Sequence, residues 1–84
     1  MTRTLTHYRY LRLRQRTIDA LRKEPNFSMC ADHLLDIAAD NDMNFWSVAD
    51  RMLCNSELVY TGREPFGSTT SAVYKLAEHL RGNV

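Results

Sequence analysis

The residues of this chain that could bind a metal or act as nucleophiles are two cysteines and three histidines. Cys30 and His33 have the spacing of one half of a zinc site. A second half at a matching spacing is missing, because Cys54 stands alone and His7 and His79 lie near the two ends of the chain. Both cysteines are therefore interpreted as small buried hydrophobes, and no metal or cofactor is expected.

Motifs typical of enzymes are missing too. Gly62 and Gly67 do not join a strand to a helix, as the glycines of a phosphate-binding loop do. No nucleophile elbow occurs, and the Cys30–His33 pair has no third group to orient it. A chain of 84 residues also rarely builds a pocket of several hundred Å3. The sequence therefore predicts a binding module, not an enzyme, and no small-molecule substrate.

Charge is distributed unevenly, although the formal net charge is only +1. Residues 1–24 contain seven Lys or Arg against two Asp or Glu, a net charge of +5. Residues 25–84 contain four Lys or Arg against eight Asp or Glu, a net charge of −4. Such asymmetry bears on partners and not on the fold.

Two predicted helices carry these charges as stripes. The basic stripe consists of Arg9, Arg12, Arg16 and Lys23, and the acidic stripe of Asp32, Asp36 and Asp40. Asp19 is spaced to pair with Arg16 and Lys23. The basic stripe could bind nucleic acid or an acidic protein, and the acidic stripe could mimic phosphates or dock on a basic partner. Both could simply be solvated, and the basic end of one molecule could meet the acidic end of another in a homodimer.

Length and composition fit one small globular domain. Residues 1–7 are expected to form a flexible tail, and residues 8–84 the domain. No apolar run approaches the ~18 residues of a membrane span, and the N-terminal segment has no apolar core like that of a signal peptide. A cytoplasmic protein is therefore expected (or a nuclear one, in a eukaryotic host).

Apolar residues three and four positions apart predict three helices, at about 8–23, 29–40 and 45–54. Ser28 and Asn44 are the expected N-caps of the second and third helices. The third helix is the most strongly specified, because its apolar positions follow the helical repeat without a gap.

Two short strands are expected near the end of the chain, at 58–61 and 72–76, where Val, Tyr and Thr alternate with other residues. Gly and Pro residues between them predict a loop of roughly nine residues. An isolated hairpin is marginal in water, so Tyr60, Tyr74 and Leu76 are expected to pack on the helices. The expected order is three helices and then a hairpin, an α+β fold.

The helix pair SMCADHLLDIAADNDMNFWSVADRML and the hairpin SELVYTGREPFGSTTSAVYKLAEHL resemble a winged helix-turn-helix domain. In regulators of that family a Leu-Val pair, a glycine and a Tyr-x-Leu phrase follow the helix pair, and ELVYTGRE…SAVYKLAEHL is similar. The resemblance covers residues 16–81. It implies a three-helix helix-turn-helix core with a C-terminal β-hairpin wing, in a DNA-binding regulator of transcription. A looser resemblance is to small host-takeover proteins of lytic phages.

The resemblance implies that the third helix enters the major groove with its outward residues, here Ser47, Asp50, Arg51 and Cys54. Arg51 is suited to reading guanine, and Asn44 and Ser47 could contact bases or phosphates. In the wing, Arg63 and the hydroxyls of residues 68–71 could hold a phosphate backbone. The implied nucleic-acid contacts are Arg9, Arg12, Arg16, Asn44, Ser47, Arg51, Arg63, Ser68 and Thr69.

The acidic stripe departs from the family's pattern, because carboxylates beside a DNA groove oppose contacts to phosphates. The alternative function is a protein-binding modulator or inhibitor that docks on a host enzyme or transcription component. Its surface would comprise Asp32, Asp36, Asp40, Trp46 and Phe66. Tryptophan is enriched at binding hot spots, but Trp46 could also be the edge of the core. Phe66 stands in the predicted loop, where it could bind a partner or fold back on the hairpin.

Overall fold

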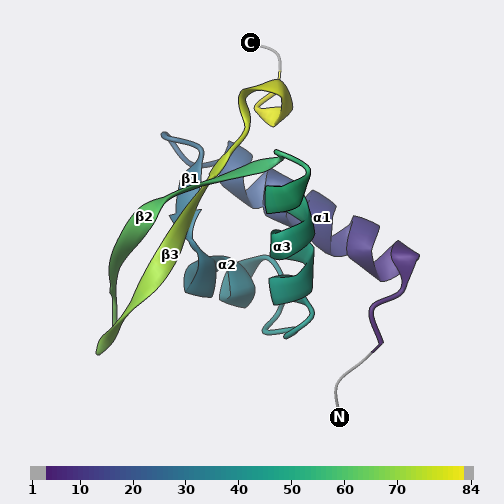
Figure 1. Ribbon diagram of the computed structural model, residues 1–84, viewed down its shortest axis with the longest axis horizontal. Helices are drawn as coiled ribbons and strands as arrows, with labels where there is room; N and C mark the ends of the chain where they lie inside the picture. The colour runs from purple at the N-terminus through teal and green to yellow at the C-terminus, as the bar shows by residue number, and fades with distance from the viewer. Residues whose placement is uncertain (1–3, 83–84) are drawn as a thin grey trace.

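The computed structural model describes residues 4–82 and combines three α-helices with a small sheet (Figure 1). In chain order the elements are α1 (His7–Arg22), β1 (Ser28–Cys30), α2 (Ala31–Ile37), α3 (Phe45–Cys54), β2 (Leu58–Phe66), β3 (Thr69–Leu76) and the 3-10 helix η1 (Glu78–Leu80). The strands pair antiparallel in the order β1-β3-β2. The predicted α+β class is confirmed.

α1 and α3 lie where the apolar periodicity predicts them, within one residue at each end. The hydroxyl of Thr6 accepts a hydrogen bond from the Arg9 N–H at 3.1 Å and caps the start of α1. Pro25 follows the helix and disfavours a helical conformation at Glu24. Residues 1–3 of the predicted tail lie outside the described residues, and Leu5 packs against the core.

The predicted second helix, at 29–40 with Ser28 as its N-cap, is wrong at both ends. Residues 28–30 form β1, in which Met29 lies opposite Tyr74 of β3, and Cys30 takes the N-cap position of a seven-residue α2. The helix ends early because Asp40 and Asn41 adopt positive φ angles, 51° and 59°. Such left-handed residues cannot continue a right-handed helix.

The hairpin is longer and its turn tighter than the predicted loop of roughly nine residues. β2 and β3 pair from Leu58 and Leu76 out to Phe66 and Thr69, so only two residues form the turn. Pro65 is tolerated because β2 is an edge strand. A bulge shifts the register between Tyr60 and Gly62, where Gly62 has a φ of +140°. Bulges bend strands and increase their twist.

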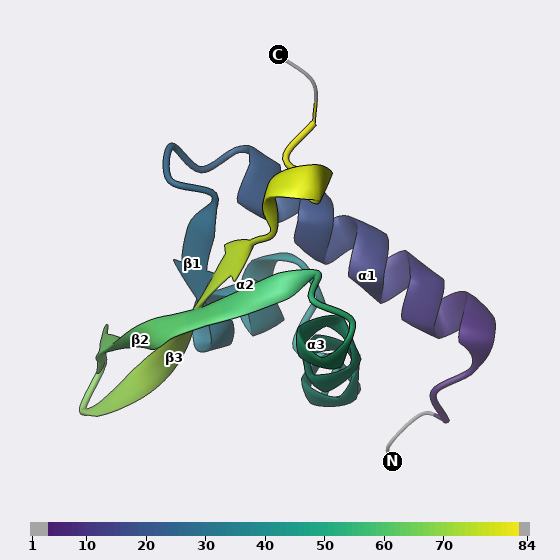
Figure 2. The same cartoon turned by 45° about the horizontal axis from the view of Figure 1, so that its top comes forward.

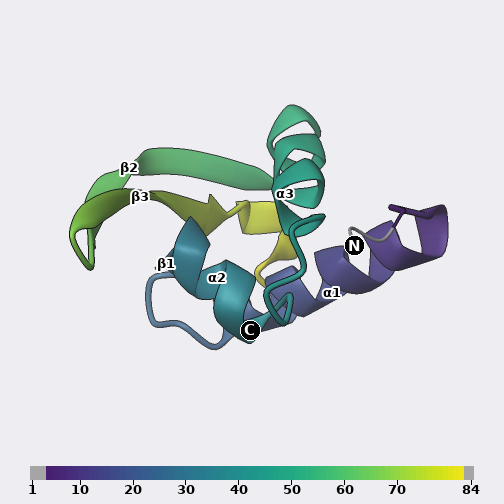
Figure 3. The same cartoon turned by 90° about the horizontal axis from the view of Figure 1, so that it is seen from below.

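The core forms where the three helices meet the base of the sheet. Its fully buried side chains are Phe45, Ile18, Leu21, Leu34, Met52, Leu76, Val48, Thr17 and Ser71. Tyr74 and Leu76 are buried as predicted, but Tyr60 is 53% exposed, so its predicted inward position is wrong. Tyr60 lies opposite Tyr74 but on the edge strand β2, whereas Tyr74 lies on the central strand β3. The far end of the hairpin projects past the helices (Figures 2 and 3). Within residues 4–82 no helix has the length and apolar character needed to cross a bilayer.

Candidate nucleic-acid interface

α3 presents a continuous polar face to solvent. Phe45, Val48, Ala49 and Met52 are completely buried and fix the rotation of the helix. The opposite side is therefore exposed, as the helical repeat requires, and it carries Ser47, Asp50, Arg51 and Cys54. Cys54 is a free thiol on this surface, so the interpretation of both cysteines as buried holds only for Cys30.

Arg51 is held on this surface by a residue of α1. Its Cζ atom lies 5.0 Å from the centroid of the Tyr10 ring, a cation–π distance. Tyr10 is itself buried, so the ring is a fixed platform. No hydrogen bond or salt bridge of the Arg51 side chain is found among residues 4–82, and a guanidinium can bind an acceptor in a bidentate contact.

A second contact ties α1 to the segment that follows α3. Arg14 Nε donates to both carboxylate oxygens of Glu57, at 3.1 and 2.9 Å, and a terminal guanidinium nitrogen forms a salt bridge with the same group. The hydrogen bond and charge of Glu57 raise the pKa of Arg14, although partial burial opposes the rise. The positive charge of Arg14 is therefore balanced within the molecule by Glu57. In the sequence, Arg14 stands on the apolar side of the first helix. That placement was the one sign in the sequence that Arg14 has an internal partner.

Trp46 lies at the edge of the core, where it is half-buried. Its ring meets that of Phe45 edge to face, with centroids 5.4 Å apart. This contact favours a packing role for Trp46 over the hot-spot role considered from the sequence.

The hairpin carries a second polar group. Arg63 donates from Nε to the Thr70 hydroxyl and from a terminal nitrogen to the Thr70 carbonyl, both at 2.9 Å. Burial raises the pKa of Tyr74, Asp50 and Tyr60 raise it further, and Arg63 opposes the rise. Asp50 of α3 and Arg63 of β2 thus act on Tyr74 in opposite directions.

The tip of the hairpin carries the remaining residues of the predicted wing. Ser68, Thr69 and Thr70 are exposed, and Phe66, opposite Thr69, is 40% exposed. Phe66 belongs to β2 and not to a loop, but the projecting hairpin leaves it accessible. The hydroxyls of Ser68 and Thr69 and the ring of Phe66 are therefore accessible to a partner, whereas the Thr70 hydroxyl already accepts a hydrogen bond from Arg63.

Ser71 is one of the hydroxyls predicted to hold a phosphate backbone. That prediction is wrong for Ser71, because it is only 1% exposed. Its Oγ accepts a hydrogen bond from the Asp32 N–H at 3.0 Å. Asp32 is the second residue of α2, so Ser71 supplies from β3 the side-chain cap that Cys30 does not.

Replacing Ser71 with alanine is expected to lower the free energy of unfolding by about 1 kcal/mol, as the loss of a helix cap does. Urea denaturation followed by circular dichroism would measure it. Ser68→Ala is the matched control, since the same change at the exposed turn is expected to cost less than about 0.5 kcal/mol. Equal effects at the two sites would contradict the capping role.

The basic stripe of α1 does not join α3. Arg9 forms a salt bridge with Asp42, in the turn before α3. Arg12 is exposed and lies about 200° around the helix from Tyr10, which faces α3. Arg16 lies between α1 and α2. The structure thus brings Ser47 and Arg51 together with Asn44, at the N-cap position of α3. Arg9 lies nearby, because Asp42 also accepts a hydrogen bond from the Asn44 N–H at 3.0 Å, but Asp42 balances its charge. Arg12 and Arg16 lie on other sides of α1.

The acidic stripe is also split. Asp32 is half-buried at the start of α2, Asp36 is exposed and accepts a hydrogen bond from Asn41, and Asp40 lies beyond the end of the helix. The neighbouring Ile37 and Met43 are 47% and 59% exposed.

Cys30 and His33 do not form a metal site with other residues. Cys30 is buried and His33 is exposed, and residues 4–82 contain no group of three or more side chains of metal-ligand type placed to hold an ion.

Comparison of the chain with known protein families, characterised proteins and solved structures found no match.

Proposed function

We propose that this chain is a non-enzymatic winged-helix domain that binds duplex DNA and regulates transcription. The observation that carries the proposal is the exposed face of α3 beside a projecting hairpin, with Arg51 held by Tyr10 and Arg63 by Thr70. Both cations are oriented before binding, which lowers the entropy lost on contact.

The dimensions and donors suit a DNA groove. An α-helix with its side chains is about 10–12 Å wide and fits the major groove, which is about 12 Å wide. Arg51 would present its N–H edge to the N7 and O6 acceptors of guanine. Arg63 and the hydroxyls of Ser68 and Thr69 would contact phosphates. In this assignment α3 reads bases and the hairpin positions it.

The charge of this surface sets the expected strength. Asp50 adds a negative charge beside Arg51 on the exposed side of α3, while the charges of Arg9 and Arg14 are balanced by Asp42 and Glu57. Arg63 is the one cation assigned to phosphate, which corresponds to a slope of about −0.9 in a plot of log affinity against log salt, so a fourfold rise in salt lowers affinity about threefold to fourfold. Binding is therefore expected to be weak and best seen at low salt.

The test is fluorescence anisotropy of labelled duplexes of mixed and of selected sequence, at low and physiological salt. Arg63→Ala is expected to weaken binding equally on all sequences and to reduce the salt slope by about 1. Arg51→Ala is expected to relax preference at one base pair by about 1–3 kcal/mol. Arg12→Ala is the matched control and should bind as the parent does, because Arg12 lies on the far side of α1.

Three outcomes would refute parts of this proposal. Equal loss on every sequence for Arg51→Ala would exclude base reading by α3. A loss for Arg12→Ala as large as that for Arg63→Ala would move the contact to α1. Failure of the parent protein to bind at low salt would refute DNA binding.

A second candidate is a modulator that binds a host protein through the end of α2. It is favoured by the exposed apolar side chains of Ile37 and Met43 beside the exposed carboxylates of Asp36 and Asp40. Protein interfaces commonly have an apolar centre, in which Met is enriched, and a polar rim. Absence of DNA binding at low salt would favour this candidate.

A further inference from the structure

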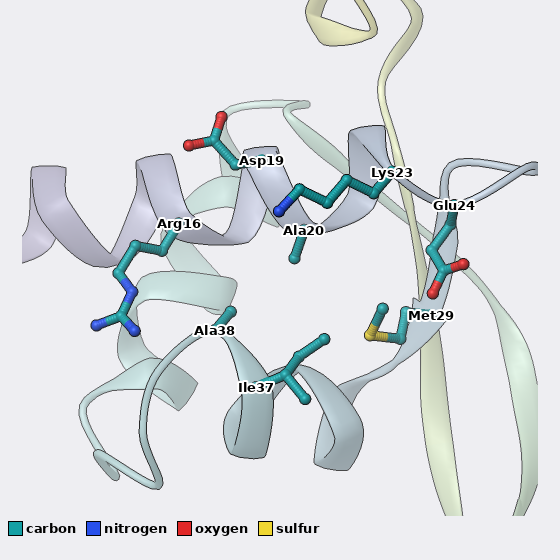
Figure 4. A pocket seen from close by; sticks show the side chains of 8 residues that line it. All are labelled: Arg16, Asp19, Ala20, Lys23, Glu24, Met29, Ile37 and Ala38. Atoms are coloured by element: carbon teal, nitrogen blue, oxygen red, sulfur yellow. The ribbon is translucent and has the colours of Figure 1, made fainter.

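A groove of about 430 Å3 lies between α1, β1 and the end of α2. Figure 4 shows the side chains that line it, and none of them belongs to α3 or to the hairpin. The volume falls within the range of small-molecule sites, about 300–1,000 Å3. The groove is therefore large enough for a ligand and separate from the proposed DNA surface.

The floor of the groove is apolar. Ala20 of α1, Met29 of β1, and Ile37 and Ala38 at the end of α2 contribute to it. Ile37 is 47% exposed, because no other element of residues 4–82 covers it. Covering this strip with an apolar group would be favourable by about 25 cal/mol per Å2 removed from water.

Two cations of α1 border this floor. Arg16 extends over one end, and the side chain of Lys23 runs back along α1 toward it (Figure 4). The salt bridges among residues 4–82 join Arg9 to Asp42 and Arg14 to Glu57, so neither Arg16 nor Lys23 is neutralised.

The acidic residues of the groove leave these two cations unpaired. Asp19, which the sequence predicts as their partner, points away from the groove (Figure 4) and accepts a hydrogen bond from Gln15 Nε2 at 2.9 Å. Glu24 lies at the opposite end, near Met29 (Figure 4). The guanidinium of Arg16 thus marks one end of the groove, the ammonium of Lys23 lies beside Ala20 between the ends, and the carboxylate of Glu24 marks the other end (Figure 4).

We propose that the groove binds a small amphipathic carboxylate, with one anionic head group and an unbranched apolar body. Arg16 can take both carboxylate oxygens in a bidentate contact, and Lys23 adds a second positive charge. The apolar body would cover Met29 and Ile37. Glu24 would repel a second carboxylate at the far end, so a monocarboxylate is favoured over a dicarboxylate. This inference goes beyond the proposed function and does not depend on it.

The test is an NMR titration of the full chain with octanoate, following the methyl groups of Met29 and Ile37. Saturable shifts of both are expected. Arg16→Gln and Lys23→Gln keep most of the apolar stem and remove the charge, and each is expected to weaken octanoate binding about tenfold, as the loss of a charge-assisted hydrogen bond does. Octanamide, which lacks the charge, and suberate, which carries a second carboxylate, are each expected to bind about tenfold more weakly than octanoate.

Arg51→Ala is the matched control variant and is expected to bind octanoate as the parent does. The proposal is overturned if the shifts do not saturate, if octanamide binds as well as octanoate, or if Arg51→Ala loses as much affinity as Arg16→Gln. Anisotropy with DNA separates the two sites, because Arg16→Gln and Lys23→Gln are expected to keep DNA affinity within about twofold. Failure of octanoate binding would then leave the DNA proposal intact. Failure of DNA binding would likewise leave the octanoate proposal intact.

Discussion

Replacing Phe45 with alanine is expected to lower the free energy of unfolding by about 3–5 kcal/mol, the usual cost of removing a buried aromatic side chain. Phe45 is completely buried, and it is the first residue of α3. A domain of this length has a total stability of about 4–13 kcal/mol. The substitution therefore removes a large share of it and is expected to give a measurable unfolded fraction at 25 °C.

Urea denaturation followed by far-UV circular dichroism would measure this loss. Fluorescence of Trp46 is a poorer probe here, because its ring packs edge to face on Phe45. Tyr60→Ala is the control, since Tyr60 is an aromatic residue of similar size that is 53% exposed. It is expected to cost less than about 1 kcal/mol. A cost for Tyr60→Ala as large as that for Phe45→Ala would contradict the assignment of the core.

The helices α1 and α3 could be predicted closely because the information that defines them is local. Phe45, Val48, Ala49 and Met52 repeat at helical spacing, and that spacing alone decides which side of α3 is buried. The same repeat determines that Ser47 and Arg51 are exposed. The outward residues of the candidate site therefore followed from the sequence once the helix was recognised.

β1 and the full hairpin could not be predicted, because their evidence is non-local. Met29 forms a strand through pairing with Tyr74, and nothing in a three-residue segment marks it as extended. Gly62 and Pro65 break a local strand pattern, but a bulge and an edge position accommodate them. Tyr60 fits an alternating pattern and lies opposite the buried Tyr74, yet it is exposed because β2 is the edge strand of the sheet.

The availability of the charged residues was equally hidden. Arg14 pairs with Glu57 across 43 positions of sequence, and Arg9 pairs with Asp42. Counting charges in the first 24 residues treats these arginines as free. The fold neutralises them and leaves the cations of α3 and of the hairpin to support the proposed DNA contact.

The bulge at Gly62 gives the second large expected effect. Gly62→Val is expected to lower the free energy of unfolding by about 1–3 kcal/mol, because φ is +140° there and residues with a side chain rarely adopt that angle. No heavy atom lies within 4 Å of the Cβ that would be added. The cost is therefore a property of the backbone and not of a steric clash, and it is measured by urea denaturation.

Gly67→Asn in the turn is the matched control, with a φ of +60° and the same open space around an added Cβ. Asparagine tolerates that left-handed conformation, so a change of less than about 0.5 kcal/mol is expected. The comparison separates strain at the bulge from a general need for glycine in the hairpin. Equal destabilisation by the two substitutions would contradict the role assigned to Gly62.

The bulge also links the backbone to the proposed function. It places Arg63 opposite Ala72, on the side of the sheet where Arg63 reaches Thr70. If valine removes the bulge, the outer part of β2 shifts by one residue and its side chains change faces. Arg63 then leaves the face on which it contacts Thr70, and DNA affinity is expected to fall as far as in Arg63→Ala. A Gly62→Val protein that is destabilised but keeps full DNA affinity would show that the bulge serves stability alone.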